Sequence, residues 1–452
     1  MEQSLFLLLV LLIASSRIEA RIDDLGYIQM LDQRMGKGED EDDEVQFFPW
    51  LQSDAIGRTL VNIDSLGAVG DGITDDTEAF VQAWKVACNT SNAVLLVPER
   101  KTYLVKAARF GGPCAGNLIV QISGEIVAPD DPNDWDPASP RTWLFFSGLR
   151  GVIFQGGGLI NGSGHNWWAS SCKIDKTKPC RPAPTAFTID SSSAVWVRSL
   201  NLKDSQQIHF TVSRSQVVRV SELNVQAPHN SPNTDGIHIS DSTNIVIQNS
   251  KIGTGDDCIS IVNGTSNIKM KNIMCGPGHG ISIGSLGKDN STAAVIGVVL
   301  DNAVLTGTTN GVRIKTWQGG SGYLRGVRFQ NVRMNNVSNP IIIDQFYCDS
   351  PTPCANQTSA VSVTEVMYIN ISGTSATPNA IKLACSDTVP CSKIVLANIN
   401  LRRDDGTAKA FCNNAIGFKY GLVIPSLDCL LSYGHDASEK RKRDRQIIHT
   451  EL

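Results

Sequence analysis

The stretch that decides the fold is residues 233–284, NTDGIHISDSTNIVIQNSKIGTGDDCISIVNGTSNIKMKNIMCGPGHGISIG. One pattern in it places a polar or small residue between two isoleucines, at 237–239, 259–261 and 281–283, with a spacing of 22 residues. A second pattern places asparagine two positions after an apolar residue, at 247–249 and 270–272. Alternating apolar and polar positions are typical of short β-strands. Each repeat therefore supplies two strands.

Both patterns continue outward along the chain. The asparagine pattern occupies 197–199, 220–222, 247–249, 270–272, 300–302, 329–331, 368–370 and 396–398, with asparagine third in six of the eight. The other pattern recurs as Ile208-His209-Phe210, Val312-Arg313-Ile314 and Ile381-Lys382-Leu383. Repeats of this length indicate a solenoid whose turns lengthen by insertion. A propeller blade needs about 40 residues, which the 23-residue intervals cannot supply.

We therefore predict an all-β, single-domain, right-handed parallel β-helix over residues 60–430. The asparagines are expected to form a hydrogen-bonded ladder inside the turns. Residues 74–88, TDDTEAFVQAWKVAC, begin with capping residues and continue with apolar residues at helical spacing. Because a solenoid must cover its open first coil, we expect an N-terminal capping helix there.

The two ends of the chain differ from its body. Residues 5–14 form an apolar run that, with a cleavage point after Ala20, predicts a signal peptide over 1–20. The acidic run 39–44 predicts a flexible leader over 21–59, and the basic cluster 440–445 predicts a solvated tail over 431–452. No later segment approaches 18 uninterrupted apolar residues, so no membrane span is expected. The net charge of −4 excludes a generally basic, nucleic-acid-coating protein.

Cysteines and glycosylation sequons indicate the compartment. The twelve cysteines form short-range pairs, although spacing alone does not prove their connectivity: Cys88/Cys114, Cys172/Cys180, Cys258/Cys275, Cys348/Cys354, Cys385/Cys391 and Cys412/Cys429. Metal binding by these cysteines is disfavoured because no CxxC pair occurs. Seven Asn-X-Ser/Thr sequons add to the expectation of a secreted protein of the extracellular space or cell wall. Nothing in the sequence demands an oligomer, so we expect a monomer.

Titratable residues converge at one place in the predicted solenoid. Asp235, Asp257 and His279 each stand two positions before the first isoleucine of a triplet, so they form a column with about 5 Å between neighbours. Asp256 adjoins this column. Aspartate in such turns can simply bond to the backbone. Three crowded carboxyls cannot all ionise easily, however, and one with a raised pKa beside an ionised one suits glycosidic cleavage.

Two cations lie one coil further along. Arg313 occupies the outward middle position of its strand, and Lys315 occupies the next outward position. Few acids stand close to them in the predicted arrangement. We therefore expect both residues to bind a substrate that bears carboxylates.

Four motifs carry a family resemblance: Asn233-Thr234-Asp235-Gly236, Gly255-Asp256-Asp257-Cys258, Gly278-His279-Gly280 and Arg313-Ile314-Lys315. In order and spacing they resemble the signature motifs of the polygalacturonase family of glycoside hydrolases. The segments Gly67–Gly72 and Trp167-Trp168 are similar to the plant-type members, so the resemblance covers about residues 60–430.

The resemblance implies a function and a set of roles. The expected activity is hydrolysis of α-1,4-galacturonosyl linkages in polygalacturonic acid or pectin, without a cofactor and with inversion at the anomeric carbon. The implied roles are Asp256 as general acid, Asp235 and Asp257 as residues that hold and activate water, His279 as support for the acid's protonation, and Arg313, Lys315, Asn233 and Tyr347 as substrate-binding residues. Packing beside Cys348 is the alternative role for Tyr347.

Several alternatives stay open. Internal (endo) cleavage is our first expectation, with end-wise (exo) cleavage or action on a rhamnogalacturonan as alternatives. A pectate lyase would need Ca²⁺ and would eliminate rather than hydrolyse, and a polysaccharide-binding β-helix would not cleave at all. Column spacing does not choose between retention and inversion, which call for different carboxyl separations.

Overall fold

A computed structural model describes residues 57–135, 141–350 and 352–432 of the 452-residue chain. The expected signal peptide, nearly all of the expected leader and nearly all of the expected basic tail lie outside these residues. Within the described part, no helix is long and apolar enough to cross a membrane.

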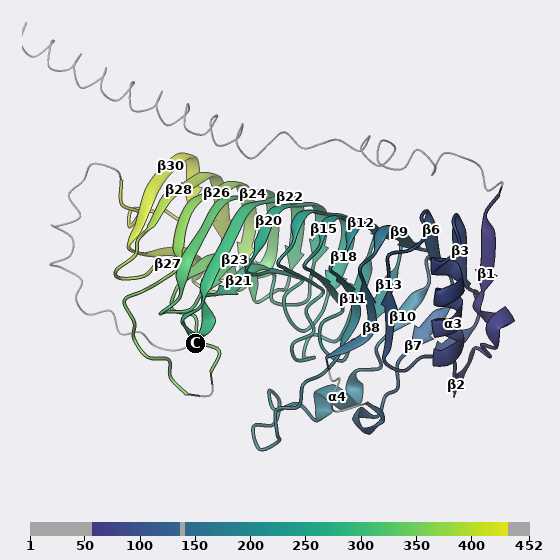
Figure 1. Cartoon of the computed structure of the whole chain (residues 1–452). Coiled ribbons are helices and arrows are strands. Elements are labelled where there is room, and N and C mark those ends of the chain that lie inside the picture. The colour runs from purple at the N-terminus through teal and green to yellow at the C-terminus, as the bar shows by residue number, and fades with distance from the viewer. Residues whose placement is uncertain (1–56, 136–140, 351, 433–452) are drawn as a thin grey trace, which may run out of the picture. The chain divides into compact units, whose positions relative to one another are not determined.

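The described chain winds into coils that stack side by side through parallel strand pairing (Figure 1). One sheet has eleven strands: β5 (Ala108–Gly111), β8 (Thr142–Ser147), β11 (Thr185–Asp190), β14 (Phe210–Ser213), β17 (Ile237–Ser240), β19 (Ile259–Ile261), β21 (Ile281–Leu286), β23 (Asn310–Thr316), β25 (Asn339–Asp344), β27 (Asn379–Ala384) and β29 (Lys409–Asn413). Each coil contributes one strand to this sheet, so residues one coil apart become neighbours.

The remaining strands form one continuous sheet of nineteen strands. They are β1 (Thr59–Asn62), β2 (Asp71–Asp75), β3 (Ala93–Val97), β4 (Thr102–Leu104), β6 (Leu118–Ile122), β7 (Glu125–Val127), β9 (Arg150–Gln155), β10 (Leu159–Asn161), β12 (Ser193–Arg198), β13 (Asn201–Lys203), β15 (Gln216–Ser221), β16 (Asn224–Gln226), β18 (Thr243–Gly253), β20 (Thr265–Cys275), β22 (Thr292–Thr306), β24 (Ser321–Val337), β26 (Ser362–Ser375), β28 (Cys391–Arg402) and β30 (Ala415–Ile424). The predicted all-β, parallel β-helix is confirmed.

The asparagine pattern marks a bend between two strand segments. Both β15 and β16 pair with the single strand β18, which turns at Asn249 with a φ of 50°. Asparagine tolerates this left-handed conformation better than most residues. Asn272 Nδ2 donates to Asn249 Oδ1 at 2.8 Å, and Asn302 Nδ2 donates to Asn272 Oδ1 at 2.8 Å. The predicted ladder therefore exists, but most of its side chains lie on the outer surface of the turns and not inside them.

Inward residues of both patterns stack into one apolar core. Ile237, Ile259 and Ile281 are aligned in register and fully buried. Burial of each such side chain contributes about 1.5–3 kcal/mol. One prediction of register is wrong. Phe210-Thr211-Val212, not Ile208-His209-Phe210, pairs with Ile237-His238-Ile239, because β14 begins two residues later than the pattern suggested.

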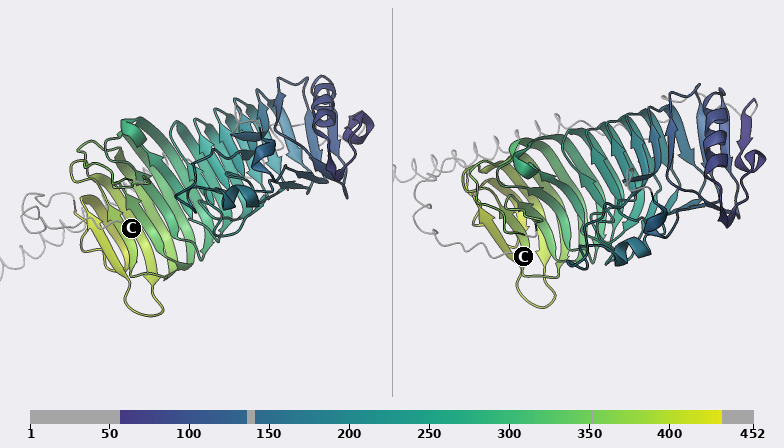
Figure 2. Two further views of the ribbon diagram at one scale, coloured as in Figure 1. Left: turned by 90° about the horizontal axis from the view of Figure 1, so that it is seen from below. Right: turned by 60° about the horizontal axis from the view of Figure 1, so that its bottom comes forward.

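The open first coil is covered by α3 (Thr77–Cys88), which starts three residues after the predicted Thr74 (Figures 1 and 2). Phe80 and Trp84 on its buried face contact Tyr103 and Phe110, with ring centroids 5.8 and 5.5 Å apart. The remaining helices are short: η2 (Ile63–Leu66), η3 (Pro132–Asp134), α4 (His165–Ala169) and η4 (Lys288–Asn290). The predicted capping helix is thus present.

Six disulfides join all twelve cysteines in the pairs that the spacing suggested. Such density of disulfides is typical of proteins that pass through the secretory pathway. Cys258, which directly follows the two acids at 256 and 257, is fully buried and bonded to Cys275. This bond ties the acidic turn to a strand of the larger sheet.

Candidate active site

The candidate site lies where successive turns enter the eleven-stranded sheet. Asp235 stands two residues before β17, Asp257 two residues before β19 and His279 two residues before β21, in the predicted column. These turns pack closely on one another. A Cβ on Gly255 would lie 2.0 Å from the Ser231 carbonyl oxygen, so only glycine fits there.

Asp257 is buried between two cations. Arg313 Nη2 lies 2.6 Å from Asp257 Oδ1, and Lys315 Nζ lies 3.0 Å from Asp257 Oδ2. The side chain of Asp257 is 2% exposed, against 12% for Arg313 and 10% for Lys315. The expectation that these cations have few acids nearby is therefore wrong. Burial works against ionisation, but the charges of Arg313 and Lys315 prevail and lower the pKa of Asp257.

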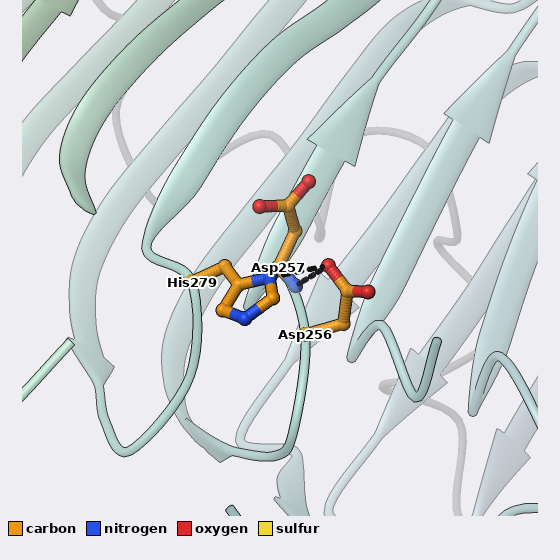
Figure 3. Close-up of side chains that lie close together, drawn as sticks. All are labelled: Asp256, Asp257 and His279. Carbon is orange, nitrogen blue, oxygen red and sulfur yellow. Dashed lines mark hydrogen bonds and ion pairs between the residues drawn. The ribbon is translucent and has the colours of Figure 1, made fainter. Parts of the chain in front are cut away.

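Asp256 faces the other way. His279 Nδ1 lies 2.9 Å from Asp256 Oδ1, and the Asp257 backbone N–H donates to the same oxygen at 2.8 Å. Figure 3 shows both contacts and the Asp257 carboxylate pointing away from them. Asn233 Nδ2 donates to Asp256 Oδ2 at 3.3 Å. The Asp256 side chain is 16% exposed, so its carboxyl remains open to an incoming ligand.

Among the described residues, no cation forms an ion pair with Asp235. Its Oδ2 accepts a hydrogen bond from Ser260 Oγ at 2.7 Å, and Ser260 Oγ lies 2.8 Å from His238 Nδ1. Burial, followed by the charges of Asp256 and Asp257, raises the pKa of Asp235 well above its usual value. Asp235 and Asp257 thus occupy one column but are pushed toward opposite protonation states.

Tyr347 lies beside the cations and not only beside its disulfide. Lys315 Nζ is 5.2 Å from the centroid of the Tyr347 ring, and Trp317 contacts the same ring edge to face at 5.6 Å. Burial raises the pKa of Tyr347 to about 12. The eight residues singled out in the sequence are therefore linked through Asp256, Asp257 and Lys315 into one site.

Sequence reasoning missed the serines under the carboxylates. Ser260 bonds to Asp235, and Ser282 Oγ donates to Asp257 Oδ1 at 2.7 Å while accepting from Arg313 Nε at 2.9 Å. Both serines are buried and stand in the outward column that contains Arg313. Their signal was present: each is the middle residue of an Ile-Ser-Ile triplet, one coil after an acid.

Oxygen and nitrogen donors of Asp256, Asp257 and His279 approach one another within 4.8 Å, a geometry that could hold a cation. Both Asp257 oxygens already contact Arg313 or Lys315, however, and these positive charges would repel a metal ion. The donor set therefore suits proton transfer better than metal coordination.

A parallel β-helix with clustered acids beside two cations on one outer face has the features expected of the polysaccharide-cleaving hydrolases of this architecture. The sequence profile described as Glycosyl hydrolases family 28 matches residues 88–419, and the chain belongs to this family. It is 50% identical over 369 residues to a probable polygalacturonase of Arabidopsis thaliana, covering 81% of this chain and 83% of the relative. It is 51% identical over 374 residues to a polygalacturonase of Persea americana, covering 82% and 80%.

Two solved structures share the fold. One is an endo-xylogalacturonan hydrolase from Aspergillus tubingensis, with a TM-score of 0.70 and 22% identity, covering 80% of this chain and 100% of the other. The second is a polygalacturonase from Erwinia carotovora, with a TM-score of 0.61 and 23% identity, covering 77% and 94%. The chain is thus a glycoside hydrolase of the polygalacturonase type, as its motifs predicted.

Proposed function

We propose that this protein hydrolyses α-1,4-galacturonosyl linkages at internal positions of de-esterified pectin in the cell wall, with inversion at the anomeric carbon. The observation that carries the proposal is the division of the carboxyls. Asp257 is held ionised by Arg313 and Lys315, whereas the pKa of Asp235 is raised beside it. Carboxyls that burial and neighbouring charges drive to different pKa values are typical of sites that carry out acid/base cleavage of a glycosidic bond.

Asp256 is best placed to act as the general acid. Its side chain is 16% exposed, against 2% for Asp257, and His279 bonds to one of its oxygens. In the proposed reaction the Asp256 proton passes to the leaving glycosidic oxygen as the bond to the anomeric carbon breaks. A water held by Asp235 and Asp257 attacks that carbon from the opposite face and gives its proton to one of these two carboxyls in its ionised form.

Arg313 and Lys315 would bind the galacturonate carboxylate while keeping their bonds to Asp257. The guanidinium uses Nε for Ser282 and Nη2 for Asp257, and its Nη1 contacts no other described residue through a hydrogen bond. A fork of five donors can serve both partners. Asn233 and Tyr347 flank Asp256 and Lys315 and complete the proposed substrate-binding set.

Internal cleavage is favoured by the length of the sheet. Strands β5, β8, β11 and β14 precede the site, and β25, β27 and β29 follow it. A polysaccharide lying across the strands could therefore continue in both directions. Viscosity and reducing ends, measured together on polygalacturonic acid, test this mode. Viscosity that falls far ahead of the reducing ends supports internal cleavage, whereas monomer release in proportion to reducing ends contradicts it.

Inversion rests on the family resemblance and has its own test. Proton NMR of the first products from an oligogalacturonate reports the anomer before mutarotation. An initial β-anomer from the α-linked substrate supports inversion, and an initial α-anomer contradicts it.

A further inference from the structure

The outward column of the eleven-stranded sheet continues from the site in both directions. Strand register aligns His238 on β17, Ser260 on β19, Ser282 on β21 and Arg313 on β23. Each serine bonds to the carboxylate that belongs to the preceding coil, Ser260 to Asp235 and Ser282 to Asp257. The two carboxylates are therefore supported in the same way by successive coils.

The directions of the hydrogen bonds around Asp235 follow from proton counting. When Asp235 is ionised, as its proposed role in activating water requires, Ser260 gives its one hydroxyl proton to Asp235 Oδ2 at 2.7 Å. Its contact with His238 Nδ1 at 2.8 Å must then be a bond that the imidazole donates. Burial lowers the pKa of His238 to about 4, so above that pH the ring is neutral and carries its proton on Nδ1.

The surroundings of Asp235 explain why this support matters. The charged groups that face it are Asp256 and Asp257 from the turn before β19 and Lys315 from β23, and only Lys315 favours its ionised form. The imidazole of a second histidine, the fully buried His209 that precedes β14, lies 3.1 Å from the Asp235 backbone oxygen and so fixes the main chain. Ser260 is the one described side chain that bonds to the carboxylate itself.

We propose that His238 and Ser260 form a hydrogen-bond relay of positioning residues, which holds Asp235 Oδ2 so that Oδ1 faces the attacking water. Ser260 is only 2% exposed, so it acts through Asp235 and not on the substrate. His238 orients the Ser260 hydroxyl by occupying its acceptor side. The inference rests on the proposed function, because it assigns Asp235 to the water-activating pair.

The primary test is the pH dependence of kcat for Ser260→Ala on oligogalacturonate. Because the Ser260 bond lowers the pKa of Asp235, its removal should move the acid limb of the profile to higher pH. A shift of one unit gives a loss on the order of tenfold on that limb, and the loss should disappear as the pH rises. KM should stay near the wild-type value.

Histidine variants provide a second, independent arm in case Ser260→Ala folds poorly. His238→Asn keeps a donor near the Nδ1 position and should retain the wild-type profile, whereas His238→Phe removes the donor and should shift the acid limb in the same direction as Ser260→Ala. The double variant should shift it no further than Ser260→Ala alone, because the histidine acts through the serine.

The matched control is Thr211→Val, which removes a hydroxyl from the same column one coil before His238. It should leave the profile unchanged. A uniform fall in kcat at every pH, a rise in KM alone, or equal behaviour of His238→Asn and His238→Phe would each overturn the relay. Wild-type protein that fails to cleave polygalacturonic acid would instead overturn the proposed function.

Discussion

Single residues show how one column of similar side chains acquires different chemistry. Asp235 and Asp257 differ by one coil, yet Asp257 contacts two cations and Asp235 contacts a serine. The sequence correctly aligned both acids with His279, because the 22-residue spacing matches the strand register. It could not show which acid the cations contact, since side-chain direction depends on packing between coils.

The buried ion pairs of Asp257 predict a large effect on stability. Asp257→Asn would leave Arg313 and Lys315 nearly buried without a counter-charge. We expect the free energy of unfolding to fall by about 3–5 kcal/mol, measured by denaturant titration. The exposed Asp404→Asn is the control and should change it little. A loss at Asp257 no larger than at Asp404 would contradict the assignment of these pairs.

Replacing Asp235 should have the opposite effect on stability from replacing Asp257. Below about its ordinary pKa of 3.8, the carboxyl is protonated in both the folded and unfolded states and contributes nothing. As the pH rises from 3.8 to the raised folded pKa, only the unfolded state releases the proton, so the wild type loses stability over this window and the full loss remains at higher pH. Asp235→Asn should therefore be inactive and yet more stable near neutral pH, with the gain in Tm shrinking as the pH falls toward 3.8. A difference in Tm that does not vary with pH would rule this out.

At the scale of elements, the asparagine ladder joins sequence to coil geometry. The pattern predicted a ladder but not its place on the outer surface, because period alone does not say which side of a bend faces water. The error at Ile208-His209-Phe210 has a similar origin. An apolar-polar-apolar triplet overlaps only the first residue of the true strand β14, and only pairing with β17 selects the register.

Variants of Asn272 separate the contribution of the side-chain hydrogen bonds from that of the left-handed backbone. Asn272 has a φ of 56° and forms hydrogen bonds to Asn249 and Asn302. In Asn272→Ala both bonds should be lost and the left-handed backbone should be strained. Left-handed backbone costs an alanine about 1–2 kcal/mol, whereas glycine adopts it freely. We expect Asn272→Ala to lower Tm more than Asn272→Gly does. Equal losses would mean that the side-chain bonds, and not the backbone, dominate.

An ion pair joins two disulfide-tied loops at the ends of strands in the eleven-stranded sheet. One precedes β11 and holds Cys172–Cys180, the other follows β25 and holds Cys348–Cys354, and Lys173 Nζ lies 2.6 Å from Asp349 Oδ1. The first loop leads into β11 and the second leaves β25, so the ion pair joins loops at opposite ends of parallel strands in the sheet that carries the candidate site. No feature of the sequence connects residues 176 positions apart.

This link should modulate access by long chains. The pair is about half exposed and is worth about 0–1 kcal/mol, so Lys173→Ala should raise the rate on polymer relative to short oligomer by at most about fivefold. Lys419 on the last strand, β30, forms a comparable exposed ion pair with Asp428, and Lys419→Ala serves as the control. An unchanged or lower ratio of polymer to oligomer rates for Lys173→Ala would argue that the link does not restrict the substrate.

For the whole molecule, the repeat predicted the architecture and the cysteine spacing matched all six disulfides. Local strands with aligned apolar residues leave few alternatives once a solenoid period is present. The residues of the candidate site could be predicted from the sequence only in part. The acids, His279 and both cations stand in motifs, whereas the roles of the supporting serines depend on side-chain contacts between adjacent coils and the Lys173–Asp349 link joins distant loops.

The most direct test of the central claim measures reducing ends and ultraviolet absorbance from polygalacturonic acid, with and without a chelator, for wild type, Asp256→Asn and Asp404→Asn. We predict reducing ends without ultraviolet-absorbing product, no effect of the chelator, and a loss on the order of 10²–10⁴ in rate for Asp256→Asn only. An absorbing product that vanishes with chelator, or full activity of Asp256→Asn, would contradict hydrolysis by the acid column.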